Sequence, residues 1–559
     1  MKVKEFIKKY HLIAYLIMII LIFTVGMAVK WYRYNEFAGH GPAIGYAYKY
    51  FNLILGYILV AATILFYLLV IRKTEMSKAF LAASILMGTL FILLMPPDTP
   101  ADEDKHMFAV TEFSNSIMGI EDDDTPYHAT YRECDANSGF SRSISISNYI
   151  LMGQKLFERP SKSDYVSYEV EHFNYAKSTF IFYLPAIIGM IISKLTGLGT
   201  VMMYFLSRFL MLAVYSVIGY FAIRKIPTGK ALLAAIMLLP TGLSRAACVS
   251  QDGLLHAVIF LFMAYVFYFA FSGNKMKVKE VIVTIVAGGL LVTGKGGAYV
   301  PLLLLLFLIP RENFGEKIKY PVVVGMAVFI TIIVFLASNP SLFTDLVGSG
   351  KGTEDELIWS DEPSYTLKNL ICNPGHSAKM LLGTFVGFFG TFFGDMISGG
   401  FGWLQISSSP VIVSCCFAIL LGLALSESNQ TIVMNKKQRI ITGVAVIGAI
   451  GLVILSMWIF WTPISYQYIA GVQGRYFIVT MLPVFMMFRN NRLSLKNDLG
   501  NKGIIAICVL AKNRNFDRNR ARGCNYGLEG GAFLIIGGCN HGFRGCITLP
   551  MGTAINRRR

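Results

Sequence analysis

The sequence predicts an all-α polytopic membrane protein with about 12–14 transmembrane helices. Of its 559 residues, 55% are hydrophobic and 15% are charged, whereas a typical soluble domain has about 25% charged residues. Apolar stretches recur along almost the whole chain, and short polar connections separate them. Repeated apolar stretches of this kind are typical of helices that cross a bilayer.

Residues 12–29 follow a lysine-rich start and lack a small-residue cleavage site. They therefore predict an uncleaved spanning helix whose amino end is cytoplasmic. The other stretches are 52–71, 79–94, 178–193, 200–222, 231–243, 254–272, 280–294, 298–310, 320–337, 378–397, 409–425, 440–460 and 476–488. Several are shorter than the ~20 residues that a spanning helix needs, so we expect some to be tilted, broken or re-entrant.

Six clusters of cations lie in the connections between apolar stretches, and we assign all six to the cytoplasmic side. They are Arg72/Lys73/Lys78, Arg224/Lys225/Lys230, Lys275/Lys277/Lys279, Arg311/Lys317/Lys319, Lys436/Lys437/Arg439 and Arg489/Arg492. This assignment leaves 95–176 and 338–408 as the main outer loops, the first of them after the third helix. The formal net charge of +17 would favour nucleic-acid binding in a soluble protein. Membrane orientation accounts for it here, and no nucleic-acid partner is expected.

Residues 1–490 form one predicted polytopic domain, and residues 491–559 differ from it in composition. From Lys512 to the end there are nine cations, two acids, nine glycines and three of the nine cysteines. One interpretation is a basic cytoplasmic tail that contacts anionic lipid. The preferred hypothesis is a reading frame that is altered near residue 511 and leaves a final helix unfinished. An uninterrupted frame in independently sequenced isolates would remove that hypothesis.

The first outer loop begins with residues 95–107, which hold the first candidate for chemistry. Two prolines end the preceding helix, because proline lacks an amide donor. A new helix is expected from Ala101, and either Asp102 or Glu103 would then share a face with His106. Carboxylates and an imidazole at a membrane edge could supply a general base. Asp102 and His106 could also bind a divalent metal, the one cofactor that we consider. The alternative is a solvated helix start whose acids suit the helix dipole.

Charged residues within or beside the apolar stretches form the second candidate, because a charge in lipid is costly and is often functional. They are Arg208, Arg245, Asp252, Lys295 and Arg475. In the topology above, the four cations lie at the outer face. A ring of cations there suits a phosphate or pyrophosphate on a lipid carrier. The alternative for each residue alone is a snorkelling or ion-paired structural role.

Four short motifs follow one another along the chain. They are Ala101-Asp-Glu-Asp-Lys-His106, Ser250-Gln-Asp252, Lys295 with Tyr299 and Pro301, and Gln473-Gly-Arg-Tyr476. In the same order, they resemble the landmarks of a bacterial membrane family known as domain of unknown function 2142. The first resembles that family's Pro-Asp-Glu-x-x-His signature, although Ala101 replaces the proline. The resemblance covers most of residues 80–490, and the segment after about residue 511 does not share it.

This family is itself similar to the GT-C glycosyltransferases, which are polytopic enzymes that use polyprenyl-phosphate-linked sugars. The resemblance implies a GT-C-like fold in a multi-pass protein of the bacterial plasma membrane, in contact with membrane lipids. It also implies transfer from a lipid-linked sugar donor to a glycan or lipid acceptor at the outer face, in cell-envelope or surface polysaccharide assembly. Asp102, or Glu103, would be the base, and His106 would orient it or bind a metal with it. The implied substrate-binding residues are Asp252, Lys295, Tyr299, Arg475 and Tyr476, and the charge inside an apolar stretch adds Arg208 to them.

Two other functions compete with this one. A transporter or flippase of a lipid-linked glycan would use the same cations to escort a phosphate. Its charges would be spread through the bilayer, or an inverted repeat would be visible, and the sequence shows neither feature. A non-catalytic membrane component of an envelope-polymer complex would need no chemistry at all.

Overall fold

The computed structural model describes residues 11–121, 128–160, 165–169, 179–314, 360, 362–402, 406, 409–426 and 432–489. The chain divides into two compact units, Met1–Arg514 and Asn515–Arg559, and every described residue belongs to the first. The apolar stretch 320–337, the start of the second outer loop and the whole basic segment 491–559 lie outside the described residues. The hypothesis of an altered reading frame therefore stays a prediction.

The prediction of an all-α polytopic membrane protein is confirmed, because helices dominate the described residues and many of them are apolar. Seven spans among these residues are long and apolar enough to cross a membrane. They lie in α2 (His11–Phe37), in η1 (Ala38–Ala43) with α3 (Ile44–Phe66) and η2 (Tyr67–Ile71), and in α4 (Met76–Leu94), α9 (Thr200–Lys225), α12 (Gln251–Phe271), α17 (Pro374–Ser398) and α19 (Lys436–Trp461). Shorter apolar helices are α8 (Phe180–Thr196), α18 (Pro410–Ser426) and the pair η7 (Gly474–Phe477) and α20 (Ile478–Phe488).

Two of the short apolar stretches are irregular, as their length predicts. Residues 231–243 divide into α10 (Lys230–Met237) and α11 (Pro240–Ala246), because Pro240 cannot continue the first helix. Every residue of the break is buried in protein, which is the condition under which broken helices are tolerated at membrane depth. Residues 298–310 form η5 (Val300–Leu308), a 3-10 helix that packs against α19.

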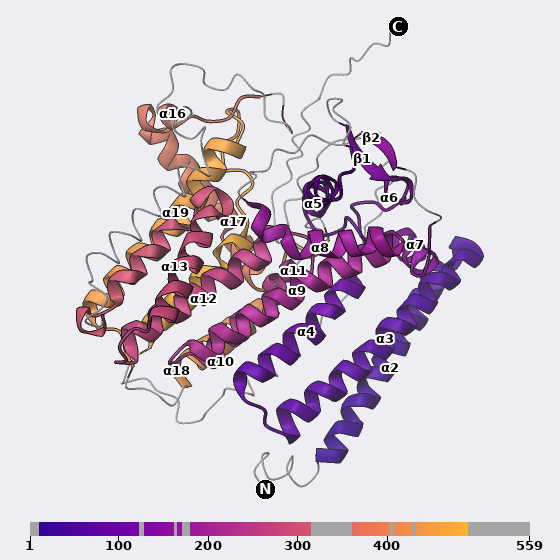
Figure 1. The fold of residues 1–559 in the computed structure, drawn as a ribbon, viewed down its shortest axis with the longest axis horizontal. Helices are drawn as coiled ribbons and strands as arrows, with labels where there is room; N and C mark the ends of the chain where they lie inside the picture. The colour runs from indigo at the N-terminus through magenta and orange to yellow at the C-terminus, as the bar shows by residue number, and fades with distance from the viewer. Residues whose placement is uncertain are drawn as a thin grey trace, which may run out of the picture. The chain divides into compact units, whose positions relative to one another are not determined.

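The first outer loop folds into small elements at one end of the bundle (Figure 1). They are α5 (Glu103–Met118), β1 (His128–Arg132), α6 (Glu133–Ala136), α7 (Ile146–Lys155) and β2 (Tyr165–Glu169). The strands β1 and β2 pair in antiparallel register, with His128 opposite Glu169 and Arg132 opposite Tyr165. Packing of α5 on α8 and of α7 on α3 joins the loop to the membrane helices.

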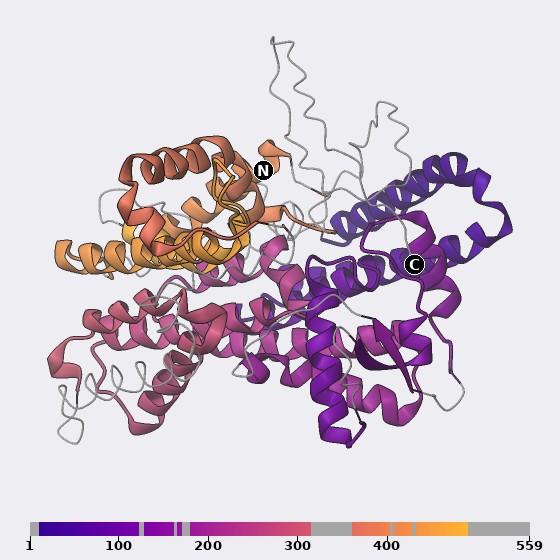
Figure 2. The ribbon, with the colours of Figure 1, turned by 90° about the horizontal axis from the view of Figure 1, so that it is seen from above.

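The long helices run side by side, and their order along the chain defines two ends (Figures 1 and 2). We call the "site end" the one at which α4, α13 (Val278–Thr293) and α17 finish and α12 and α20 begin. The opposite "cation end" gathers the described members of the predicted cytoplasmic clusters. There Lys225 contacts Glu280 at 2.5 Å, and Arg439 donates to the carbonyl of Arg489 at 2.9 Å. The cation clusters therefore lie on one side of the bundle, as predicted.

Candidate functional site

The connection between α4 and α5 is held by a guanidinium from α9. Because prolines follow Met95, the last carbonyls of α4 have no helical partner. Arg208 donates to the carbonyls of Met95 at 2.5 Å and of Pro96 at 3.0 Å. The Thr99 hydroxyl donates to the same Pro96 oxygen at 2.7 Å. The polar connection is thus a defined structure and not a loose loop.

Two acidic residues in this connection have left-handed backbone, Asp98 with φ 61° and Asp102 with φ 65°. Left-handed conformations of non-glycine residues are uncommon and cluster at functional sites, although Asp tolerates them better than most. The expected helix from Ala101 is wrong by two residues, because α5 begins at Glu103 and Asp102 precedes it. Although Asp102 itself is left-handed, its carbonyl still accepts a hydrogen bond from the His106 amide at 3.1 Å.

The structure separates the two candidate carboxylates. The Glu103 side chain is fully buried and forms an ion pair with Arg208, whose Nε donates to its Oε1 at 2.8 Å. The Val249 amide donates to the same oxygen at 2.9 Å. Asp102, in contrast, keeps 40% of its side chain exposed. Glu103 and Arg208 therefore lie together beneath the connection, tying α5, α9 and the turn before α12, while Asp102 is the accessible carboxylate.

Asp102 contacts a residue from the far end of the sequence. Its Oδ2 accepts a hydrogen bond at 2.9 Å from Nη2 of Arg475, at the start of η7 and α20. Burial raises the pKa of Asp102, but the charge and hydrogen bond of Arg475 more than offset this and leave the pKa below its usual range. Asp102 is therefore ionised at neutral pH and lies within reach of solvent.

A second carboxylate, Asp252, joins Arg475 to a lysine. Asp252 stands in the first turn of α12, where Ser250 caps the helix. It lies 2.9 Å from Nζ of Lys295 and 3.8 Å from Nε of Arg475. Lys295 has a left-handed backbone, with φ 47°, and its ammonium sits 3.7 Å from the ring centroid of Tyr476. Three of the four non-glycine residues with positive φ in the described chain are thus at this site.

His106 lies on the first turn of α5, and its Nδ1 shares a hydrogen bond of 2.6 Å with the hydroxyl of Tyr183. Burial lowers the pKa of His106 to about 4, although the Asp102 carboxylate opposes that shift. The imidazole is therefore neutral at physiological pH. It positions the start of α5 through Tyr183 of α8.

Tyr299 is placed differently from the expected ligand contact. It is fully buried, and its hydroxyl donates to the carbonyl of Tyr476 at 2.9 Å, so it supports the backbone beside Arg475. Gly474 is required on the other side of that backbone, because an added Cβ would lie 1.9 Å from the carbonyl oxygen of Phe392 in α17. The turn that carries Arg475 is therefore held between Tyr299, directly before η5, and α17.

Asp395 of α17 belongs to the same cluster and was missed in the sequence. Its carboxylate accepts the backbone N–H of Gly474 and faces the charges of Arg475 and Arg245. Arg245 itself donates to the carbonyl of Ala101 at 2.9 Å and of Gly400 at 3.2 Å. A single acid inside an apolar helix is a functional hypothesis by default, and that signal was available for Asp395.

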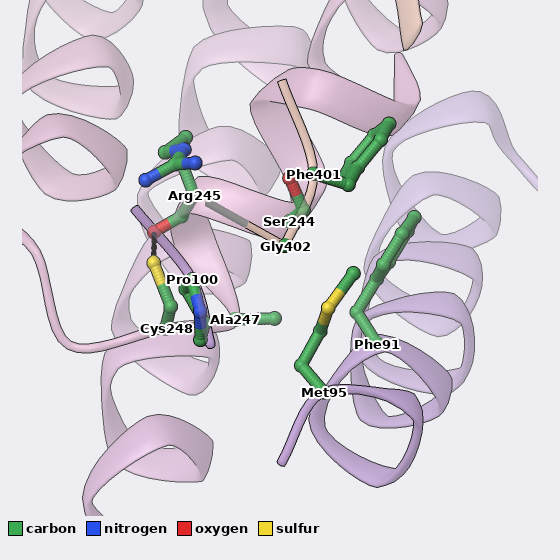
Figure 3. Close-up of a pocket in the computed structure, with 9 residues that line it drawn as sticks. All are labelled: Phe91, Met95, Pro100, Ser244, Arg245, Ala247, Cys248, Phe401 and Gly402. Atoms are coloured by element: carbon green, nitrogen blue, oxygen red, sulfur yellow. Dashed lines mark hydrogen bonds between the residues drawn. The ribbon is translucent and has the colours of Figure 1, made fainter. Parts of the chain in front are cut away.

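A small apolar cavity lies beside the site, between the end of α4 and the turn from α11 to α12 (Figure 3). Phe91 and Met95 line one side and Phe401 packs on Phe91, with ring centroids 5.9 Å apart. Arg245 directs its guanidinium away from these apolar side chains (Figure 3). The cavity has room for about one water molecule, so it is a packing gap and not a substrate pocket.

Residues 85–484 match the model of a family described as a predicted membrane protein family, DUF2142, and this is well over half of the chain. The chain belongs to the DUF2142 family. The match starts within α4 and ends within α20, so it includes every residue of the site. No curated protein and no solved structure matches this DUF2142 chain.

In the DUF2142 site, the two expected metal ligands, Asp102 and His106, each have a side-chain partner. Among the described residues, no group of three or more His, Cys, Asp or Glu side chains could hold a metal ion. Asp102 is engaged by Arg475, and Nδ1 of His106 by Tyr183. The described side chains of the DUF2142 site thus place an ionised carboxylate, Asp102, beside a buried cation, Arg475.

The buried carboxyl group of Asp98 should make the stability of the DUF2142 chain depend on pH. Burial raises its pKa to about 7, against the hydrogen bond of 2.5 Å that Tyr204 donates to it. The folded state thus binds this proton more tightly than the unfolded state does, so the stabilisation is full below about pH 4 and is lost as pH rises through 7. We expect Asp98→Asn to raise the Tm in detergent by a few degrees at pH 8 and by clearly less at pH 5, where only part of the stabilisation has been lost. An equal change at both pH values would contradict the assignment.

Proposed function

We propose that this protein is a GT-C-like glycosyltransferase that uses a polyprenyl-phosphate-linked sugar. One observation carries the proposal: the accessible carboxylate of the first loop, Asp102, meets Arg475, and a second carboxylate, Asp252, joins that arginine to Lys295 at the same end of the bundle. Asp102 is 2.9 Å from Arg475, and Asp252 is 2.9 Å from Lys295 and 3.8 Å from Arg475. Transfer of a sugar from a lipid phosphate needs a base for the acceptor hydroxyl and cations that bind the phosphate, and this site brings both together.

Asp102 is the base in this proposal. The acceptor hydroxyl gives its proton to the carboxylate, its oxygen attacks the anomeric carbon, and the bond from that carbon to the carrier phosphate breaks. Direct displacement of this kind inverts the anomeric configuration. Asp102 suits the role better than Glu103, because it is ionised and 40% exposed, whereas Glu103 is fully buried against Arg208.

Arg475 and Lys295 hold the donor phosphate and stabilise the charge that develops on the leaving group. Arg475 offers a planar fork of donors, and Lys295 a compact point charge. Both are held by carboxylates that an incoming phosphate would displace or share. Arg208 and Tyr299 act indirectly, by supporting the backbone that carries Asp102 and the backbone that carries Arg475.

The proposed place of the reaction is the outer face of a bacterial plasma membrane. Lys and Arg are enriched on the cytoplasmic side of membrane proteins, and the described cation clusters lie at the end opposite to the site. The amino terminus would then be cytoplasmic. The partners would be a lipid-linked sugar, a glycan or lipid acceptor, and the surrounding lipids.

Purified full-length protein in lipid nanodiscs tests the proposal directly. A panel of radiolabelled polyprenyl-phosphate hexoses and pentoses is supplied with candidate acceptors, and free polyprenyl phosphate is measured. Release of the carrier with label on the acceptor supports the enzyme. Passage of labelled lipid across proteoliposomes without carrier release would instead identify a flippase.

Removal of the Lys295 charge is predicted to weaken donor binding. A charge-assisted hydrogen bond contributes about 1.5–3 kcal/mol, so Lys295→Met should raise the KM for the lipid donor by roughly 10–100-fold. Lys279→Met is the matched control, because Lys279 is exposed at the opposite end of α13. An unchanged donor KM in Lys295→Met would remove Lys295 from the donor site.

A further inference from the structure

A buried histidine lies directly below the charge cluster. His256 follows Asp252 by four residues in α12, so the two side chains share one face of the helix. It is 1% exposed, and neither ring nitrogen has a hydrogen-bond partner among the described residues. Buried polar groups are nearly always paired, so an unpaired imidazole requires an explanation.

The groups that face His256 are the residues of the proposed donor site. They are Asp252 on its own helix, Lys295 in the turn after α13, Arg475 in η7 and Arg245 in α11. Three cations and one carboxylate therefore set the potential at the imidazole. A bound phosphate group would cancel part of the positive potential, because it brings negative charge into the same low-dielectric region, one charge as the phosphodiester of the sugar donor and up to two as a phosphate monoester.

Arg475 supplies an independent sign that a ligand belongs here. Its Nε is buried and makes no hydrogen bond within the described chain, and the Oδ2 atom of Asp252 is 3.8 Å away from it. A guanidinium N–H is a strong donor whose desolvation is costly if it stays unpaired. The group that would pair with it is an acceptor such as a phosphate oxygen.

We propose that binding of a phosphate group at Arg475 and Lys295 is coupled to uptake of one proton by His256. This inference rests on the proposed donor site. When the phosphate takes over Lys295 and Arg475, Asp252 loses part of its pairing, and a buried unpaired carboxylate is costly. An imidazolium one turn along the helix replaces the lost partner. The proton comes from solvent and returns to it when the phosphate leaves.

The coupling is measured by isothermal titration of the full-length protein in detergent. The two probes are inorganic phosphate and farnesyl phosphate, so that a free anion and a lipid headgroup are compared. Titrations in buffers of different ionisation enthalpy count the protons taken up by the wild type. Dissociation constants of wild type, His256→Gln and His376→Gln are then compared from pH 5.5 to 8, and the wild-type to variant ratio cancels the titration of the probe itself.

We expect uptake of up to one proton per bound phosphate group. We also expect the wild type to bind the phosphate probe more tightly than His256→Gln does. The ratio of their dissociation constants should grow by up to tenfold per pH unit as pH falls through the titration of the imidazole. His376→Gln, which changes a histidine at the start of α17, should behave as the wild type. Tight binding with no uptake and no dependence on His256 would overturn the coupling and leave the donor site intact. If neither inorganic phosphate nor farnesyl phosphate binds, both the donor site and the coupling are overturned.

Discussion

Replacement of Asp102 by asparagine is expected to lower kcat/KM for sugar transfer by about 10²–10⁴-fold, the usual contribution of a general base. Asparagine preserves the size of the side chain and can still accept a hydrogen bond from Arg475, which now bonds to Asp102 at 2.9 Å. It cannot take the proton of an acceptor hydroxyl. Carrier release from the labelled donor is the measurement, with membrane insertion and Tm followed in the same preparations.

Asp104→Asn is the matched control for that experiment. Asp104 lies two residues further along, in the first turn of α5, and its carboxylate pairs with Arg142 at 2.5 Å near the surface. We expect activity within about threefold of the wild type, because the energy of an exposed pair is small. Near-normal transfer by Asp102→Asn would reject Asp102 as the base, whatever the control shows.

Replacement of Glu103 by alanine is expected to cause the largest loss of stability. Removal of one partner from a buried ion pair costs about 3–5 kcal/mol, because the other charge stays buried without compensation. Here the stranded charge is Arg208, which also holds the carbonyls of Met95 and Pro96. The expected result is a Tm lower by several degrees and a smaller folded fraction in size-exclusion chromatography.

Two further variants distinguish this mechanism from general fragility. Glu103→Gln removes the charge but keeps an acceptor for the Val249 amide, so its loss of stability should be smaller than that of Glu103→Ala. Arg142→Met breaks the more exposed pair, in which the Arg142 side chain is 40% exposed, and should cost no more than about 1 kcal/mol. A Glu103→Ala protein as stable as Arg142→Met would show that the buried pair is not an anchor.

The sequence predicted the membership of the site better than the roles within it. Asp102 was singled out by its place after a helix end, and Arg475 by its charge beside an apolar stretch. Their contact agrees with the expectation that both converge on one site. Asp102 and Glu103 were equivalent in the sequence, because both lie within reach of His106. The partner that buries Glu103 is Arg208, and 105 positions separate the two residues.

Asp395 and His256 are two residues whose roles could not be predicted from the sequence. Asp395 is a lone acid in a helix rich in Phe and Gly, and only the approach of α17 to Gly474 gives it a role. His256 had a visible neighbour, Asp252, but its lack of a partner is a property of the packed helices. The charge of Asp395 in an apolar helix is visible in the sequence, but the contacts of both side chains depend on segments that are far apart along the chain.

The amino-acid order alone determined the membrane class, the grouping of cations on one side and the family, because hydrophobicity and short motifs are properties of neighbouring residues. Tertiary packing decided that Asp102 and not Glu103 is exposed to solvent and that Arg208 holds the turn after α4. It also decided which charges lie close enough to affect His256. Those outcomes depend on Coulomb energy and desolvation, which vary with distance and burial and only exist once the helices are packed.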